Sequence, residues 1–127
     1  MLLLDAFDKM KALPIIEVGS DHLGERVYKQ KHGTCYKGLC PMHTEKHASF
    51  YLKPRINIYI CYGCGELGGP IRLTLKLLDK EKAREYLLRK TEMPRQLAKD
   101  DRFFEWLWQM EDEIVHSRNS EFDRWVT

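Results

Sequence analysis

Two short stretches, Cys40-Pro41-Met42-His43 and Cys61-Tyr62-Gly63-Cys64, decide what this chain can fold into. Each places two metal-ligating side chains three residues apart, and seventeen residues separate the two stretches. Two chelating pairs with this separation are typical of a structural zinc ribbon. Zn²⁺ prefers four tetrahedral ligands, and two side chains at this spacing on a tight turn can face one ion. The spacing therefore predicts one structural zinc ion, held by Cys40, His43, Cys61 and Cys64.

The predicted ligand set fills all four positions and leaves no open site for a catalytic water. The alternative is that the three cysteines are reduced core residues and His43 is a surface side chain. Cys35 is the remaining cysteine, and we expect it to be a buried free thiol, or a substitute ligand if His43 does not bind. His32 and His47 lie nearby and stay outside the predicted site, because lone histidines are more often surface or packing residues.

Two hairpins are predicted to deliver the two chelating turns. The first turns at His32-Gly33 and the second at Pro54-Arg55. Strand pairs of this size are marginal alone, so the metal is expected to supply stability that a small core cannot. The expected strands cover residues 26–31, 34–39, 49–53 and 56–61.

Helices are predicted on both sides of these strands. Residues 71–77 alternate apolar and polar side chains, which alone indicates a strand, but Pro70 suits the first position of a helix and leucine favours helix. The expected helices cover residues 2–13, 14–19, 70–78, 79–90 and 101–115. The predicted fold class is α+β: a zinc ribbon with a small antiparallel β-sheet flanked by α-helices, plus a C-terminal helical extension.

The composition indicates the class of protein. Its 127 residues are 43% hydrophobic and 31% charged, as in a globular protein, and no apolar run approaches the roughly 20 residues that span a bilayer. We therefore expect a cytoplasmic protein with no membrane partner.

The charge is distributed unevenly along the chain. Residues 1–90 carry a net charge of +6 and residues 91–127 a net charge of −4. The predicted division is a zinc-binding domain over 1–90 and an acidic helical extension over 91–127, which folds back or meets another protein.

Residues 38–50 and 59–69 together resemble the N-terminal zinc-binding domain of DnaG-type bacterial primases. That family reads Cys-Pro-Phe-His-x-Glu-Lys-Thr-Pro-Ser-Phe, then Tyr-x-Cys-Phe-Gly-Cys-Gly and Gly-Gly-Asp, and the resemblance extends over roughly residues 12–90. This sequence departs from the pattern at His47-Ala48, where the family has Thr-Pro, and at Pro70, where it has Asp. The resemblance implies a domain that engages single-stranded template DNA and helps select where an RNA primer begins. It also implies a separate TOPRIM-type polymerase domain as partner, and allows a replicative helicase.

The residues themselves also indicate a nucleic-acid surface. Residues 26–60 hold seven Lys or Arg against one acid, and aromatic residues are interleaved with them. Lysines that track phosphates and rings that stack on bases are the components of a single-strand site. Because side chains alternate along a strand, only some of the rings, which include Tyr51, can face outward. The predicted nucleic-acid-binding residues are Lys37, Lys46, Phe50, Lys53, Arg55, Tyr59 and Tyr62.

The predicted function is that of a zinc-binding, single-stranded-DNA-binding module of a DnaG-like primase, without catalytic residues of its own. The alternative is a zinc-ribbon adaptor that docks on a replication polymerase or helicase through helix 101–115. A complete small enzyme would need clustered carboxylates in a pocket, whereas Glu111-Asp112-Glu113 indicate a solvated helix face. These interpretations differ in whether the chain binds nucleic acid, a protein or a small substrate.

Overall fold

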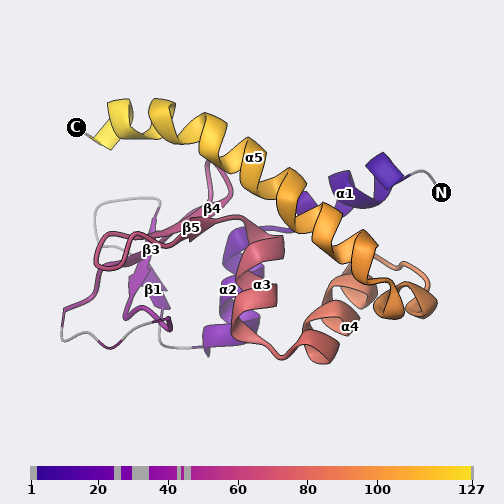
Figure 1. The fold of residues 1–127 in the computed structure, drawn as a ribbon. Coiled ribbons are helices and arrows are strands. Elements are labelled where there is room, and N and C mark those ends of the chain that lie inside the picture. The colour runs from indigo at the N-terminus through magenta and orange to yellow at the C-terminus, as the bar shows by residue number, and fades with distance from the viewer. Residues whose placement is uncertain (1–2, 25–26, 30–34, 43, 45–46, 127) are drawn as a thin grey trace.

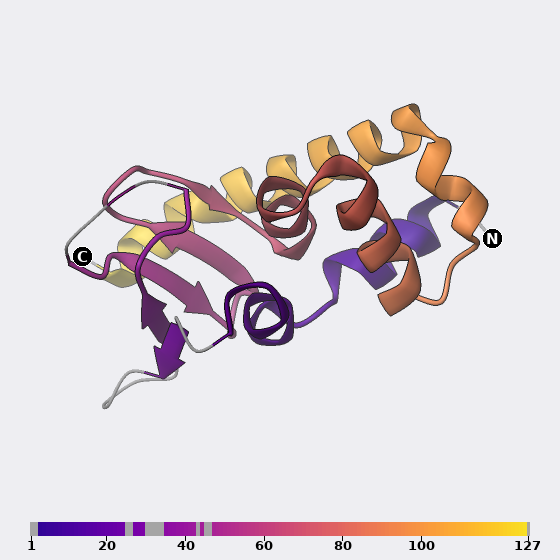
Figure 2. The same ribbon diagram turned by 90° about the horizontal axis from the view of Figure 1, so that it is seen from below.

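The computed structural model describes residues 3–24, 27–29, 35–42, 44 and 47–126. Two helices come first, followed by five strands, two more helices, a 3₁₀ turn and one long helix (Figure 1). The long helix, α5 (Asp101–Val126), runs along the molecule and covers both the other helices and the sheet in the two views (Figures 1 and 2). The remaining helices are α1 (Leu3–Lys11), α2 (Ile15–Leu23), α3 (Pro70–Leu77) and α4 (Lys80–Lys90), with the 3₁₀ turn η2 at Arg95–Lys99.

The sheet is antiparallel throughout, in the order β1-β2-β3-β4-β5. The pairing of β1 with β2 and of β3 with β4 confirms the predicted strand arrangement, while the predicted turn at His32-Gly33 lies outside the described residues. One chelating stretch follows β2 and the other lies at the end of β4. The fourth strand begins two residues later than predicted, because residues 54–57 form the turn. The strands are β1 (Val27–Lys29), β2 (Tyr36–Gly38), β3 (Phe50–Lys53), β4 (Ile58–Cys61) and β5 (Leu67–Gly68).

Strands β3 and β4 differ in how they are buried. In β3 the side chains alternate, so that Phe50 and Leu52 lie in the core while Tyr51 and Lys53 are half-buried. Every residue of β4 is buried. Tyr59 and Cys61 belong to the main core, whereas Ile58 and Ile60 pack with Val115 of α5 on the opposite side. Strand β4 is therefore enclosed on both faces.

The turn between β3 and β4 fastens the sheet to the first two helices. Asn57 adopts a left-handed backbone conformation with φ of 56°. Its side-chain oxygen accepts a hydrogen bond from the backbone N–H of Ile15 at 2.7 Å, and its side-chain nitrogen donates to the carbonyls of Lys11 and Leu13 at 3.0 and 2.9 Å. One side chain thus satisfies the backbone groups left unpaired between α1 and α2.

Two predicted helix boundaries were wrong. The second helix does not stop at Gly19, which lies inside α2 against Leu52, and it ends before Gly24, whose φ of 59° suits a glycine. The last helix continues past residue 115 to Val126. The ambiguous stretch after Pro70 is helical, as predicted, with Pro70 in its first turn.

The C-terminal helix belongs to the same core as the preceding elements. Phe103, Phe104 and Leu107 are buried there together with Ile71 and Leu87. The prediction that residues 111–113 form a solvated face was wrong for Glu111, which is 1% exposed. Within the described part of the chain, no helix, α5 included, is long and apolar enough to cross a membrane.

Candidate metal centre and nucleic-acid interface

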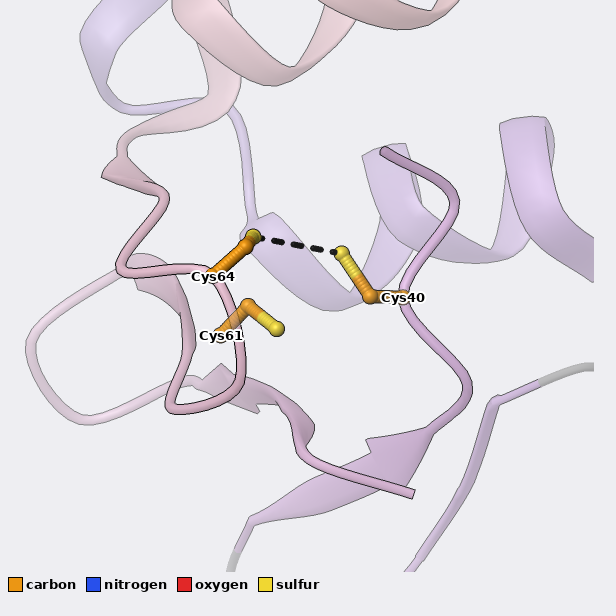
Figure 3. Close-up of side chains that lie close together, drawn as sticks. All are labelled: Cys40, Cys61 and Cys64. Carbon is orange, nitrogen blue, oxygen red and sulfur yellow. Dashed lines mark hydrogen bonds between the residues drawn. The ribbon is translucent and has the colours of Figure 1, made fainter. Parts of the chain in front are cut away.

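Three cysteines from two distant parts of the chain meet at the end of the sheet (Figure 3). Cys40 follows β2, Cys61 is the last residue of β4, and Cys64 lies in the turn that follows. Their sulfur atoms all lie within 4.8 Å of one another, and the Sγ atoms of Cys40 and Cys64 are 3.9 Å apart. Cys40 and Cys61 are buried and Cys64 is exposed, so the cluster lies at the surface of the domain.

This sulfur geometry fits a tetrahedral zinc ion. Zn–S bonds of about 2.3 Å place two sulfurs of a tetrahedron about 3.8 Å apart. The turns also supply hydrogen-bond donors that stabilise thiolates. The N–H of Met42 donates to Cys40 Sγ at 3.4 Å, and the Ser49 hydroxyl lies 3.4 Å from Cys61 Sγ. The N–H of Gly65, a glycine with φ of 78°, donates to the carbonyl of Cys61 at 2.8 Å and closes the second turn.

The cysteine pair at the centre has opposite pKa shifts. Burial raises the pKa of the Cys40 thiol to about 12. Burial also opposes ionisation of Cys61, but hydrogen bonds from Ser49 and from the N–H groups of Cys64 and Gly63 outweigh it and lower the pKa of this thiol. Cys61 is therefore the more easily ionised of the two thiols, and a metal that binds Cys40 as a thiolate must displace its proton.

The fourth predicted ligand, His43, lies outside the described residues. Cys35 is half-buried and is not part of the sulfur cluster, in keeping with its exclusion from the predicted site. His47 is exposed and also lies outside the cluster, and His32 is not among the described residues. The structure thus brings together the three predicted cysteine ligands.

A group of lysines and tyrosines lies on the side of the sheet opposite the main core, where Tyr51 also packs against the cluster that contains Ile60. Lys37 of β2 pairs in register with Tyr51 of β3, and its Nζ lies 5.6 Å from the centre of the Tyr51 ring. The Nζ of Lys53 lies 4.8 Å from the same ring. The ring of Tyr62, from the second chelating turn, meets Tyr51 edge-on at 5.4 Å between centroids. We call Lys37, Tyr51, Lys53 and Tyr62 the tyrosine–lysine face.

Two predicted nucleic-acid contacts were wrong. Phe50 and Tyr59 are 0% exposed and pack against each other in the core, with 5.7 Å between ring centroids. The Tyr59 hydroxyl donates to Glu66 at 2.9 Å, so neither ring can stack on a base. Arg55 is exposed in the β3–β4 turn, and Lys46 lies outside the described residues.

Tyr51 is the residue that the predicted set omitted. The alternation in Phe50-Tyr51-Leu52-Lys53 was the available signal, since it places the tyrosine on the same side as the lysine. The prediction chose Phe50 instead, although an outward Tyr51 and Lys53 require Phe50 to point inward.

Comparisons with known proteins agree with this geometry. A 105-residue stretch is 32% identical to the DNA primase of Thermotoga maritima, covering 74% of this chain and 18% of the relative. The DNA primase of Chlamydia trachomatis is 46% identical over 54 residues, covering 42% of this chain and 9% of the relative. The chain thus spans less than a fifth of the length of these primases.

A solved structure and a family model match the fold and the metal centre. The crystal structure of the Aquifex aeolicus primase, with its zinc-binding and RNA polymerase domains, superposes with a TM-score of 0.59 at 27% identity. The match covers 74% of this chain and 23% of the other. The family model of the DnaG zinc ribbon, described as a CHC2 zinc finger, matches residues 7–101. With three cysteines placed around one point, the chain holds a single zinc ion. This protein belongs to the CHC2 zinc-finger family of DnaG-type DNA primases.

Proposed function

We propose that this chain is the template-engaging module of a DnaG-type primase, binding single-stranded DNA on the tyrosine–lysine face and regulating where an RNA primer begins. The observation that carries the proposal is the placement of two lysine amines beside the Tyr51 ring, which in turn meets the ring of Tyr62. Lysines attract phosphates and rings stack on bases of any sequence, which suits a single strand. Arg55 and Lys46 are the further phosphate contacts that we propose.

The zinc ion contributes indirectly to this face. Tyr62 follows Cys61 directly, and its N–H donates to the carbonyl of Ser49 at 3.0 Å. The ring is 48% exposed, so it is accessible to a base while its backbone is held between a strand and the metal turn. We propose that His43 completes the zinc site with Cys40, Cys61 and Cys64, and that the ion is structural because four protein ligands leave no position for substrate.

The proposed module is not catalytic on its own. Primer synthesis needs carboxylates that hold Mg²⁺ ions across the reacting phosphates. Over the residues that the structure describes, the cysteine cluster is the one group of three or more side chains placed to hold a metal. Two of the three adjacent acids on α5 are engaged elsewhere, Glu111 with backbone N–H groups and Asp112 with Arg72. We therefore assign polymerisation to a separate TOPRIM-type domain, with which this module acts in the cytoplasm.

Salt-dependent binding to fluorescent single-stranded DNA tests the proposed interface. Lys37→Ala or Lys53→Ala should each reduce the log–log salt slope by about 0.7, the contribution of one phosphate contact on a single strand. Tyr62→Ala should weaken binding by about 1–3 kcal/mol for a stacked base. Lys9→Ala, which changes an exposed lysine on α1 outside the tyrosine–lysine face, is the matched control and should leave the slope unchanged.

The outcomes separate the proposed function from its alternative. Absence of binding at low salt, or equal losses in Lys9→Ala and Lys53→Ala, would contradict the DNA interface and favour a protein-docking adaptor. A template-directed assay with labelled ribonucleotides then tests regulation. The chain alone should incorporate none, and adding it to its polymerase domain should change where primers start. Incorporation by the chain alone would contradict the assignment of catalysis to another domain.

A further inference from the structure

Helix α3 begins without a cap from its own neighbourhood. The residue before its first turn is Gly69, which has no side chain to accept hydrogen bonds from the first N–H groups. Those N–H groups instead donate to Glu111 of α5. The N–H of Ile71 lies 2.9 Å from Glu111 Oε2, and the N–H of Arg72 lies 2.8 Å from Oε1. These are the second and third residues of the helix, the two that an N-cap side chain normally serves.

The carboxylate of Glu111 occupies the space that a local capping side chain would need. A Cβ added at Gly69 would lie 2.6 Å from the carboxyl carbon of Glu111. The backbone of Gly69, with φ of −103°, does not itself require glycine. The N–H of Gly69 adds a third hydrogen bond to Glu111 at 3.2 Å. The close approach of Glu111 therefore explains the glycine, and a side chain at 69 would force the docked Glu111 carboxyl group to move.

We propose that Glu111 is a long-range N-cap that latches α5 onto the zinc ribbon, so that the first turn of α3 is complete only while α5 is docked. This inference goes beyond the proposed DNA interface and does not depend on it. The family match ends at residue 101, the first residue of α5, so the latch attaches a helix that the family model does not cover.

Arg72 reinforces the latch from the side of the metal turn. Its Nε donates to Glu66 at 2.8 Å and its Nη1 donates to Asp112 at 2.7 Å. Its guanidinium also lies 4.8 Å from the centre of the Trp108 ring. Glu66 is two residues beyond Cys64, so this contact chain connects the second chelating turn to two side chains of α5.

The surroundings of Glu111 agree with a fully docked carboxyl group. Burial raises the pKa of Glu111 to about 7, with Asp112 adding to the rise, while the three N–H donors oppose it. A small cavity of about 60 Å³ borders the group and is also lined by Lys11, Asn57 and Val115. The latch thus lies at the junction of α1, the β3–β4 turn, α3 and α5.

The latch is tested by measuring how Gly69→Ser changes the melting temperature in the original chain and in Glu111→Ala, where the change should have opposite signs. Gly69→Ser should lower the melting temperature of the otherwise unchanged chain, because the new Cβ collides with Glu111. In a Glu111→Ala background the same Gly69→Ser should raise it, because the serine hydroxyl can cap the N–H groups that Glu111 has left. Glu113→Ala, an exposed acid on the same helix, is the control and should show no such coupling with position 69. A change of the same sign in both backgrounds would overturn the proposal.

Hydrogen exchange provides a second measurement on chains that carry zinc. In Glu111→Ala, the amide hydrogens of Ile71 and Arg72 should exchange faster with solvent. The exchange rates of the α5 amides around residue 111 should rise as well. Adding Gly69→Ser should restore protection in α3 but not in α5. If α5 stays as protected in Glu111→Ala as in the original chain, Glu111 does not hold the helix in place. If the Gly69→Ser chain does not fold, the hydrogen-exchange pattern of Glu111→Ala decides whether Glu111 holds α5 in place.

Discussion

The buried carboxyl group of Glu111 predicts that raising the pH from 6 to 8 destabilises the protein. Its pKa rises from 4.5 to about 7 because burial penalises the charged form more than three N–H donors favour it. Between these values the folded chain binds more protons than the unfolded chain, so stability is lost as pH rises. The full difference between the two pKa values corresponds to about 3 kcal/mol. Between pH 6 and pH 8 the linkage relation gives a loss of about 1 kcal/mol.

Denaturant unfolding of the original chain and of Glu111→Gln, at matched pH values with zinc in excess, isolates this effect. The variant cannot titrate at position 111. Between pH 6 and pH 8 the original chain should therefore lose about 1 kcal/mol of unfolding free energy relative to the variant. Burial lowers the pKa of His22, which makes stability fall below pH 6.5, but His22 is present in both proteins and cancels in the difference. Parallel stability curves from pH 6 to pH 8, or a difference that grows in favour of the original chain, would refute the reasoning.

The remaining predictions concern the metal and the β3–β4 turn. Chelation should release one zinc per chain, measured with a colorimetric dye, and should unfold the sheet by circular dichroism, since structural zinc contributes about 10–16 kcal/mol to folding in small domains. Cys64→Ser should abolish stoichiometric zinc, whereas Cys35→Ser should retain it; the opposite pattern would contradict the ligand assignment. Asn57→Ala removes three hydrogen bonds and leaves the N–H of Ile15 unpaired, so its unfolding free energy should fall by about 2–4 kcal/mol in denaturant titration. A loss below about 0.5 kcal/mol would mean that water replaces this side chain without cost.

The parts of the fold that follow from local patterns could be predicted from the sequence. Pairs of ligands three residues apart indicated the chelating turns, and Pro70 correctly favoured a helix over a strand for the alternating residues that follow. Alternation in β3 separates Phe50 and Leu52 from Tyr51 and Lys53 because only one face of that strand is fully buried in the main core. The reasoning failed for Tyr59, since β4 has no outer face to which its ring could turn.

Long-range polar contacts were harder to predict. Glu111 stands between two other acids, which indicated a solvated surface, but it also continues the helical spacing of Phe104 and Leu107 toward Val115. That stripe is buried, and a carboxylate within it needs donors. Its donors are N–H groups some 40 residues earlier in the chain, at the start of another helix. The stripe could have indicated that Glu111 is buried, but no local pattern identifies the partner.

The double enclosure of β4 affects which substitutions this domain can accept during evolution. A strand with one solvent-exposed face tolerates polar variation at every second position. Strand β3 approaches this at half-buried Lys53, whereas its Tyr51 packs against the cluster that contains Ile60. Strand β4 has no such position, because residues 58–61 contact either the main core or Val115 of α5. Four consecutive positions are therefore restricted together, and the side chains on one face can change size only in step with α5. Sequence changes in the C-terminal helix are therefore constrained by packing against β4, the strand that carries the zinc ligand Cys61.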